Sequence, residues 1–251
     1  MNLGIIIRVA LYALFLAFLL SPQSFEGVFA PFAANGAPAI YTQTSLLALT
    51  LSHIALVGIA TVAATAVSLC LAIIVTRPSG REFLPLSRSI ANIGQTFPPV
   101  AVLALAVPVF GFGPVPTLIA LFLYGLLPIF ENALTGLTAL PPSVQEAARG
   151  AGMTNLQRLV NVEFPLALPV IITGIRLSAV ISLGTATVGS TVAAKTLGEV
   201  IIAGLISNNT AFVLQGGLIV GALALAIHDG FTLIENRLTR RTRAPVPAAV
   251  A

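Results

Sequence analysis

Residues 141–169 read PPSVQEAARGAGMTNLQRLVNVEFPLALP, a polar stretch between two long apolar segments. The two prolines that open it are expected to end the preceding helix, because proline lacks the N–H that a helix interior requires. Ser143, followed three residues later by Glu146, has the pattern of a capping box that starts a short helix. Gly150 and Gly152 are expected to end that helix, since glycine readily takes left-handed backbone angles.

A second helix is expected after the glycines. Thr154 and Gln157 repeat the capping-box pattern, and we expect the helix that they start to end before Pro165. Two short helices joined by a turn would form a rigid protrusion that suits docking against a soluble partner. The alternative is an ordinary connecting loop. Long structured loops are usually functional, so the docking interpretation is favoured.

The composition around this loop is that of a membrane protein. Hydrophobic residues make up 57% of the chain and charged residues 8%, whereas soluble domains carry roughly 25% charged residues. So much apolar surface suits a bilayer, which does not require a polar exterior. The 251 residues leave no stretch outside the membrane for a soluble domain of about 100 residues. Catalytic or ligand-capturing domains would therefore belong to other polypeptides.

Long apolar segments predict about six transmembrane helices. They cover residues 5–21, 44–76, 90–110, 115–138, 168–194 and 210–234. The second segment is longer than a bilayer requires, so part of it must tilt or protrude. The first segment could instead be a cleaved signal peptide, with Arg8 as its charged flank and Val28-Phe29-Ala30 as a small-residue cleavage site. The length of its apolar run and its single charge favour a retained helix.

The positions of Lys and Arg predict the orientation. With six spans, one side of the membrane carries Arg8, Arg77, Arg81, Arg88, Arg149, Arg158, Arg237, Arg240, Arg241 and Arg243. Lys195 lies on the other side, and Arg176 lies within the fifth segment. The positive-inside rule then places both termini and the 139–167 loop in the cytoplasm. Because the basic residues are scattered over loop ends, the net charge of +4 does not indicate nucleic-acid binding.

The loop resembles the coupling loop of the permease subunits of bacterial binding-protein-dependent ABC importers. That family has Glu-Ala-Ala, three residues, Gly, nine residues, an aliphatic residue, one residue, an apolar residue and Pro. The matching residues here are Glu146, Ala147, Ala148, Gly152, Val162, Phe164 and Pro165. All spacings agree, and Phe164 stands where Leu is usual.

The resemblance extends over about residues 40–235. GQTFPP at 94–99, ALFLYGLLP at 120–128 and LALPVI at 166–171 resemble stretches of the osmoprotectant permeases, which import betaine, choline and related compounds. The stretch KTLG at 195–198 departs from that subfamily, whose members are often glycine-rich there.

The resemblance implies an all-α polytopic membrane protein with the MetI-like fold of type I importers, in the bacterial inner membrane. It would comprise an N-terminal transmembrane helix with an external loop (1–40), a permease core (41–235) that contains the coupling loop 139–167, and a basic cytoplasmic tail (236–251).

The resemblance also implies a division of labour. The permease provides a path with alternating access, while partner ATPase subunits bind ATP and Mg and dock on the coupling loop. The chain would then not be an enzyme and would bind no cofactor or metal. Gly184–Thr191 mimics a phosphate loop but lacks its lysine and lies in an apolar segment. The other implied partners are a second permease, identical or related, and an external substrate-binding protein.

Polar groups at membrane depth are candidates for the translocation path. They are Gln95, Thr96 and Pro98 in the third segment and Ser178, Ser182 and Thr185 in the fifth. Prolines free backbone carbonyls, which is tolerated where these face protein or a water-filled cavity. The three hydroxyls of the fifth segment share one helical face. The alternative is that such hydroxyls hold neighbouring helices together.

Two other functions compete with the importer permease. A secondary transporter driven by an ion gradient would need intramembrane ionisable groups on its path, and His53 or Glu131 could serve. An accessory protein that only scaffolds a complex is the third possibility.

Overall fold

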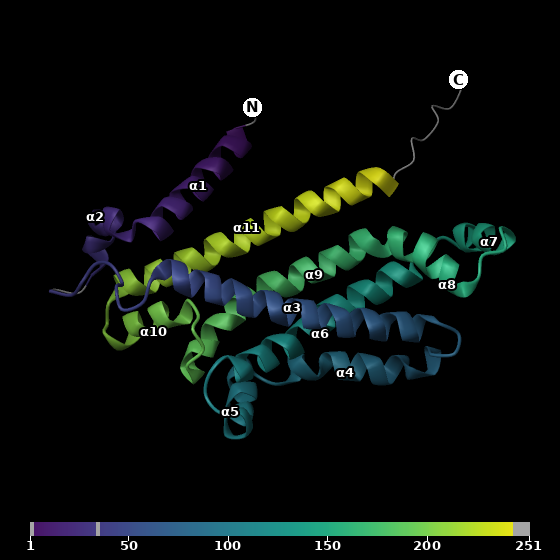
Figure 1. Cartoon of the computed structure of the whole chain (residues 1–251), viewed down its shortest axis with the longest axis horizontal. Coiled ribbons are helices and arrows are strands. Elements are labelled where there is room, and N and C mark those ends of the chain that lie inside the picture. The colour runs from purple at the N-terminus through teal and green to yellow at the C-terminus, as the bar shows by residue number, and fades with distance from the viewer. Residues whose placement is uncertain (1–2, 34–35, 243–251) are drawn as a thin grey trace.

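The fold is that of a computed structural model, which describes residues 3–33 and 36–242. In this part of the chain every regular element is helical, as the sequence predicted (Figure 1). The main helices are α1 (Leu3–Leu20), α2 (Glu26–Phe29), α3 (Leu46–Thr76), α4 (Leu84–Thr96), α5 (Pro99–Phe110), α6 (Pro114–Thr138), α7 (Pro142–Gly150), α8 (Asn155–Arg158), α9 (Phe164–Ala186), α10 (Gly198–Ile206) and α11 (Thr210–Thr242). Short 3₁₀ helices are η1 (Pro22–Phe25), η2 (Ala30–Phe32), η3 (Arg81–Phe83) and η5 (Thr187–Val192), and η4 (Leu159–Glu163) is a π-helix. The end of the predicted basic tail, residues 243–251, lies outside the described residues.

Four helices are long and apolar enough to cross a membrane by themselves: α3, α6, the continuous helix Asn155–Val192, and α11 up to Thr239. Two bent pairs raise the number to six if each pair counts as one span. The first pair joins Ile6–Leu20 to Pro22–Phe32 at 118°, and the second joins Arg81–Thr96 to Pro99–Phe110 at 94°.

The third predicted segment, 90–110, is therefore not one helix. Phe97 precedes Pro98, and the proline ring disfavours helical angles in the residue before it. Phe97 accordingly has φ −108° and ψ 139°, and the chain turns there from α4 into α5.

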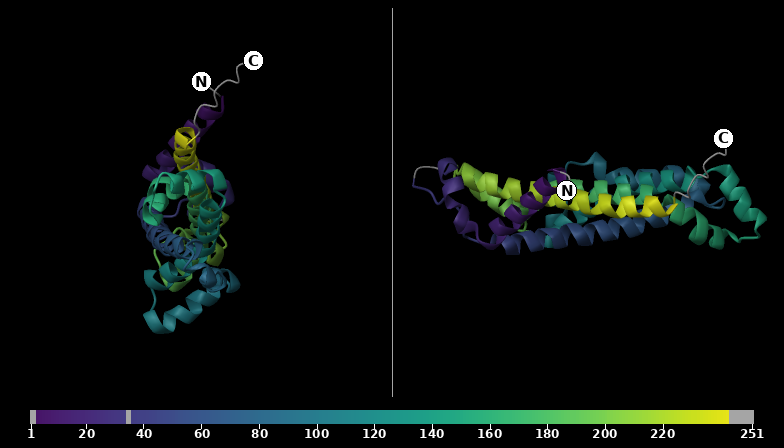
Figure 2. Two further views of the ribbon diagram at one scale, coloured as in Figure 1. Left: turned by 90° about the vertical axis from the view of Figure 1, so that its right-hand side faces the viewer. Right: turned by 90° about the horizontal axis from the view of Figure 1, so that it is seen from above.

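The centre of the molecule consists of α3, α6 and α9, which lie lengthwise beside one another, with α4 along α6 (Figures 1 and 2). Their shared core is apolar and includes Ala64, Ala91, Leu126, Phe130 and Ile171. Small residues allow these helices to approach closely. A Cβ at Gly94 of α4 would overlap the backbone carbonyl of Leu123 in α6. A Cβ at Gly174 of α9 would lie 2.6 Å from the Cβ of Asn132 in α6.

A second core lies at the opposite end from α7, where α10, α11 and the segment before α3 meet. Gln215 of α11 fastens that segment. Its side chain accepts a hydrogen bond from the backbone N–H of Tyr41 at 3.1 Å and donates one to the carbonyl of Ala39 at 2.7 Å. The rings of Tyr41 and Phe212 pack edge to face with centroids 5.4 Å apart.

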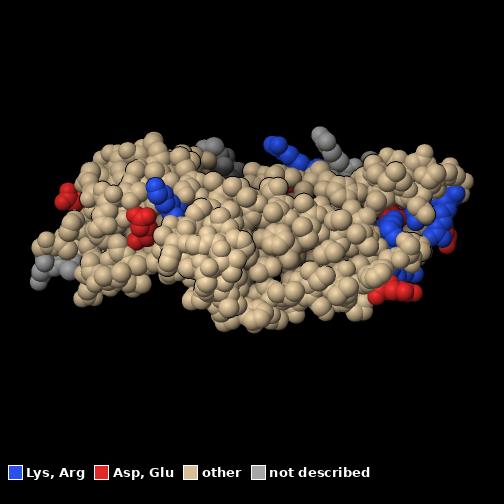
Figure 3. Space-filling view, turned by 60° about the horizontal axis from the view of Figure 1, so that its bottom comes forward, with Lys and Arg blue, Asp and Glu red and all other residues tan. Residues whose placement is uncertain are grey.

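Most charged side chains in Figure 3 lie near the two ends of the molecule, and a basic group on the upper edge stands between them above a broad uncharged surface. The larger group lies at the end that carries α7 and α8. This distribution suits a protein whose middle lies in hydrocarbon, where charged groups are costly.

Candidate functional site

The loop between α6 and α9 protrudes at one end of the molecule, beyond the helices that it connects (Figure 1). Its first helix, α7, begins two residues earlier than a Ser143 cap would place it. Pro141 is the N-cap and Pro142 is the first helical residue. Within the described residues no hydrogen bond joins Ser143 to Glu146, so the predicted capping box is wrong. Proline at the first helical position replaces the cap, because the N–H that it lacks would have no partner there.

The turn after α7 is closed by two backbone hydrogen bonds. The N–H of Gly152 donates to the carbonyl of Arg149 at 2.9 Å, and that of Met153 donates to the carbonyl of Ala148 at 3.2 Å. This is the Schellman arrangement, which requires a left-handed residue after the helix. Gly152 supplies it with φ 75°, as predicted. Gly150 is instead the last residue of α7.

The second capping box is confirmed. The backbone N–H of Thr154 donates to Gln157 Oε1 at 2.9 Å, and the N–H of Gln157 donates to Thr154 Oγ1 at 3.3 Å. The helix that follows does not end before Pro165, contrary to the prediction. It passes through the π-helix Leu159–Glu163 into α9. The wider π turn accommodates a proline, which would otherwise clash with the carbonyl four residues back.

The residues of the Glu-Ala-Ala motif divide between surface and interior. Glu146, Ala147, Gly152 and Pro165 are exposed, Val162 is half-buried and Ala148 is buried. Within the described residues Glu146 has no ion pair, so its carboxylate is free to meet a partner.

Two apolar side chains on the loop were not singled out from the sequence. Leu156 is 69% exposed and Val160 56% exposed. They are four residues apart and so share one helical face. This i, i+4 spacing of apolar residues in a polar loop is the signal that could have identified them. With the exposed charged side chains of Glu146 and Arg149 they give the protrusion a mixed apolar and charged surface.

Glu163 was also not singled out, and it is 3% exposed. Its Oε2 accepts from Arg77 Nη2 at 2.5 Å, and its Oε1 accepts from Arg158 Nε at 2.7 Å. Arg77 follows the last residue of α3, whereas Arg158 ends α8. One buried carboxylate therefore connects the 139–167 loop, named the docking loop after its expected role, to α3 and to the start of α9.

The path candidates of the third segment lie at the bend between α4 and α5, where Gln95, Thr96 and Pro98 are all exposed. Gln95 Nε2 donates to the carbonyl of Tyr124 at 3.1 Å. The Tyr124 hydroxyl donates in return to the carbonyl of Phe97. These two hydrogen bonds hold the bend against α6.

The path candidates of the fifth segment are in a different environment. Ser178 and Ser182 are buried, and Thr185 is half-buried and donates to the carbonyl of Ile181 at 3.1 Å. A Cβ at Gly125 of α6 would lie 2.8 Å from Ser178 Oγ. The burial of both serines, with Ser178 against α6, favours the helix-packing alternative for them. The six candidates do not share one cavity, and their role in the path stays a prediction.

The groups considered for an ion-coupled path are engaged in structural contacts. His53 Nδ1 accepts the N–H of Leu197 at 3.2 Å, so Nε2 carries the proton and donates to the carbonyl of Leu183 at 3.0 Å. Glu131 accepts two hydrogen bonds from Arg88, at 2.6 and 3.0 Å. A fully buried neutral imidazole and a bidentate ion pair are poor proton carriers. Within the described residues no group of three His, Cys, Asp or Glu side chains could hold a metal ion.

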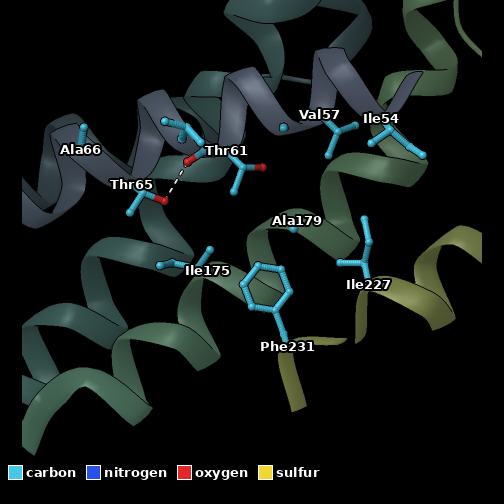
Figure 4. A pocket seen from close by; sticks show the side chains of 11 residues that line it. Ile54, Val57, Thr61, Thr65, Ala66, Ile175, Ala179, Ile227 and Phe231 are labelled. Carbon is cyan, nitrogen blue, oxygen red and sulfur yellow. Dashed lines mark hydrogen bonds between the residues drawn. The ribbon is translucent and has the colours of Figure 1, made fainter. Parts of the chain in front are cut away.

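A cavity of about 510 Å³ opens between α3, α9 and α11 (Figure 4). Its walls are mostly aliphatic, with Phe231 from α11. The hydroxyl of Thr65 donates to the carbonyl of Thr61 at 2.7 Å and so is not free for a ligand. A cavity of this kind suits hydrocarbon rather than a polar solute.

Comparison with known proteins confirms the family. The family of binding-protein-dependent transport system inner membrane components matches residues 68–241. The osmoprotectant import permease protein OsmY of Salmonella typhimurium is 38% identical over 200 residues, which cover 80% of this chain and 85% of that protein. The choline transport system permease protein OpuBB of Bacillus subtilis is 36% identical over 194 residues, with coverage of 77% and 88%.

The fold is also shared with a solved structure. A chain of the inward-facing MetNI methionine ABC transporter superposes with a TM-score of 0.70 at 21% identity, covering 78% of this chain and 96% of that chain. The predicted MetI-like fold is thus confirmed. The match over residues 68–241, together with relatives above 30% identity over most of their length, shows that the protein belongs to the inner-membrane permease components of binding-protein-dependent ABC transporters, as a multi-pass transport subunit.

Proposed function

We propose that the chain is the permease subunit of an ATP-driven importer of osmoprotectants such as glycine betaine or choline. The single observation that carries the coupling role is the geometry of the 139–167 loop. A glycine-dependent turn and a capping box fix two short helical pieces at the end of the molecule. The exposed Glu146 lies on that protrusion. The substrate class rests on relatives named for osmoprotectant and choline transport.

Docking would be transmitted to the membrane helices without a flexible joint. The helix Asn155–Val192 is continuous through the π turn, so a displacement of α8 moves α9. The carboxylate of Glu163 carries the same displacement to the end of α3 through Arg77. ATP and Mg would be bound by the partner ATPase.

The partners follow from the same role. The described cavity beside α9 is apolar, which supports a polar path formed only where a second permease, identical or related, faces this one. Recognition of a quaternary ammonium group favours an aromatic cage, and this chain has no Trp and three Tyr. Selection of the solute is therefore assigned to an external binding protein.

The proposed orientation places both termini and the 139–167 loop in the cytoplasm. It is supported by the clustering of basic residues on that side of a six-span topology. The proposed organisation keeps an N-terminal helix and external loop (1–40), a permease core (41–235) and a basic tail (236–251).

Glu146→Lys tests the coupling role in cells that carry the complete transporter. We expect uptake of labelled glycine betaine or choline to fall at least tenfold while the amount of permease in the membrane is unchanged. Glu82→Lys makes the same charge change at an exposed carboxylate of η3, outside the motif, and should leave uptake within about twofold. Normal uptake by Glu146→Lys would reject the coupling role. Transport by the purified chain alone in vesicles, without ATPase, would instead identify a secondary transporter.

A further inference from the structure

A second, polar cavity of about 190 Å³ lies at the base of the docking loop. It lies between the end of α3, the η3 turn, the end of α6, α7, α8 and the last residue of η4. Its most conspicuous feature is charge. Four arginines line it, Arg77, Arg81, Arg149 and Arg158, and the only acidic side chain among the lining residues is Glu163.

Both oxygens of the Glu163 carboxylate already have an arginine partner. Each of its oxygens accepts a charge-assisted hydrogen bond, one from Arg77 and one from Arg158. Within the described residues no ion pair joins Arg81 or Arg149 to any carboxylate, and both side chains are exposed. Four positive charges against one negative leave a net charge of +3 around the cavity. Like charges held this close repel one another unless an anion lies among them.

Unused hydrogen-bond donors accompany the unbalanced charge. In the part of the chain that the structure describes, Nε and Nη1 of Arg77 are buried without a partner. Leaving buried donors of a charged group unpaired costs free energy. An anion in the cavity would offset that cost through its negative charge. It would accept hydrogen bonds from these two nitrogens once the Arg77 side chain moved toward it. The amide of Gln145 adds a neutral polar group to the same wall.

We propose that this cavity binds a phosphoryl group, supplied by an anionic phospholipid headgroup or by inorganic phosphate. The planar guanidinium group presents paired donors that match phosphate oxygens. Basic pockets between helices at the cytoplasmic end of a membrane protein suit lipid headgroups.

The ligand would bridge Arg149 on α7 to Arg81 on η3. It would thereby hold the docking loop against the membrane helices, and its occupancy would set how freely α7 moves. The inference does not depend on which solute the permease carries, because binding is measured on this chain alone.

The test uses the full-length chain and the double variant Arg81→Gln/Arg149→Gln. Both arginines are exposed and make no ion pair within the described residues, so the variant should fold. Arg237→Gln is the control for loss of an exposed arginine, since it removes one positive charge near the end of α11, away from the cavity. Inorganic phosphate is titrated against chloride at constant ionic strength, with the rise in Tm as readout. In a second arm, phosphatidylglycerol or phosphatidylcholine retained by the protein is measured by native mass spectrometry.

The expected result is binding of phosphate, or selective retention of phosphatidylglycerol, by the wild type and by Arg237→Gln, with at least a tenfold loss in the double variant. A response in the phosphate arm identifies a soluble ligand, and a response confined to the phosphatidylglycerol arm identifies a headgroup site. Equal binding by the wild type and the double variant overturns the proposal. So does a double variant that keeps both ligands but no longer associates with the ATPase, because the arginines would then serve a protein contact.

Discussion

Arg77 Nη2 lies 2.5 Å from Glu163 Oε2, although the two residues are 86 positions apart in the chain. The contact fastens the end of α3 to the start of α9 beneath the docking loop. Arg158 joins the same carboxylate from α8. Three elements that would have to move together during coupling are therefore connected through one side chain.

Replacing that carboxylate should be costly. Glu163→Gln leaves two largely buried guanidinium groups without their counter-charge, and breaking a buried pair costs about 3–5 kcal/mol. We expect a clear drop in Tm of the purified chain. Glu131→Gln removes a carboxylate from a more exposed pair with Arg88 and should lower Tm much less, because solvent screens exposed ion pairs. Equal losses of stability in the two variants would contradict a special role for the buried carboxylate.

Gly152 should tolerate no side chain without loss of coupling. Its φ of 75° costs a residue with a Cβ about 1–2 kcal/mol, so Gly152→Ala should loosen the turn. We expect reduced uptake at normal membrane abundance. Gly150→Ala is the control, because Gly150 is helical and has open space around its Cβ position. Uptake by Gly152→Ala that equals uptake by Gly150→Ala would show that the left-handed turn is dispensable.

The contact of α4 with α6 depends on Gly94. A Cβ there overlaps the backbone of Leu123, which cannot move aside as a side chain could. Gly94→Ala should push α4 away from α6, break the hydrogen bond from Gln95 to Tyr124, and lower both Tm and uptake. Gly58→Ala introduces the same methyl group where no atom lies within 4 Å and should be neutral. Unchanged stability in Gly94→Ala would mean that the two helices are not packed this closely.

The stability of the core around Tyr41 should fall in strongly alkaline solution. Burial, together with the hydrogen bond to Glu199, raises the pKa of Tyr41 to about 12, from about 10 in an unfolded chain. The folded state thus favours the protonated phenol, and this stabilisation is present below pH 10 and is lost as the pH rises toward 12. Tyr41→Phe should lose less stability than the wild type between pH 10 and 12, measured by unfolding at each pH. If the two proteins lost the same stability between pH 10 and 12, the raised pKa of Tyr41 would not contribute to folding.

Part of the docking loop could be predicted from residues that lie close together in the chain. The turn at Gly152 and the capping box of Thr154 and Gln157 involve hydrogen bonds between residues no more than five positions apart. Such bonds require no residue from elsewhere in the chain, and these two predictions were confirmed. The low charge and the apolar segments likewise decided the membrane class, because an apolar exterior requires lipid whatever the detailed packing.

Other local patterns did not form the predicted structure, because neighbouring residues favoured a different backbone geometry. Ser143 and Glu146 match a capping box, but the prolines before them start α7 two residues earlier. The proline at 165 was expected to end a helix, yet a π turn carries the chain through it. The same residue type at position 98 does produce a break. The two prolines differ in the residue before them, since Phe97 is extended whereas Phe164 is helical and follows the π turn.

The sequence by itself determined the helical class, the membrane environment and the turn of the docking loop, since each follows from composition or from residues close in the chain. Only the tertiary structure decided that Ser178 and Ser182 are buried, that Ser178 lies beside Gly125 of α6, and that Glu163 is paired twice. It also brought four arginines around one cavity. These features join residues tens of positions apart, and helix periodicity specifies which face a residue occupies but not which helix will cover it.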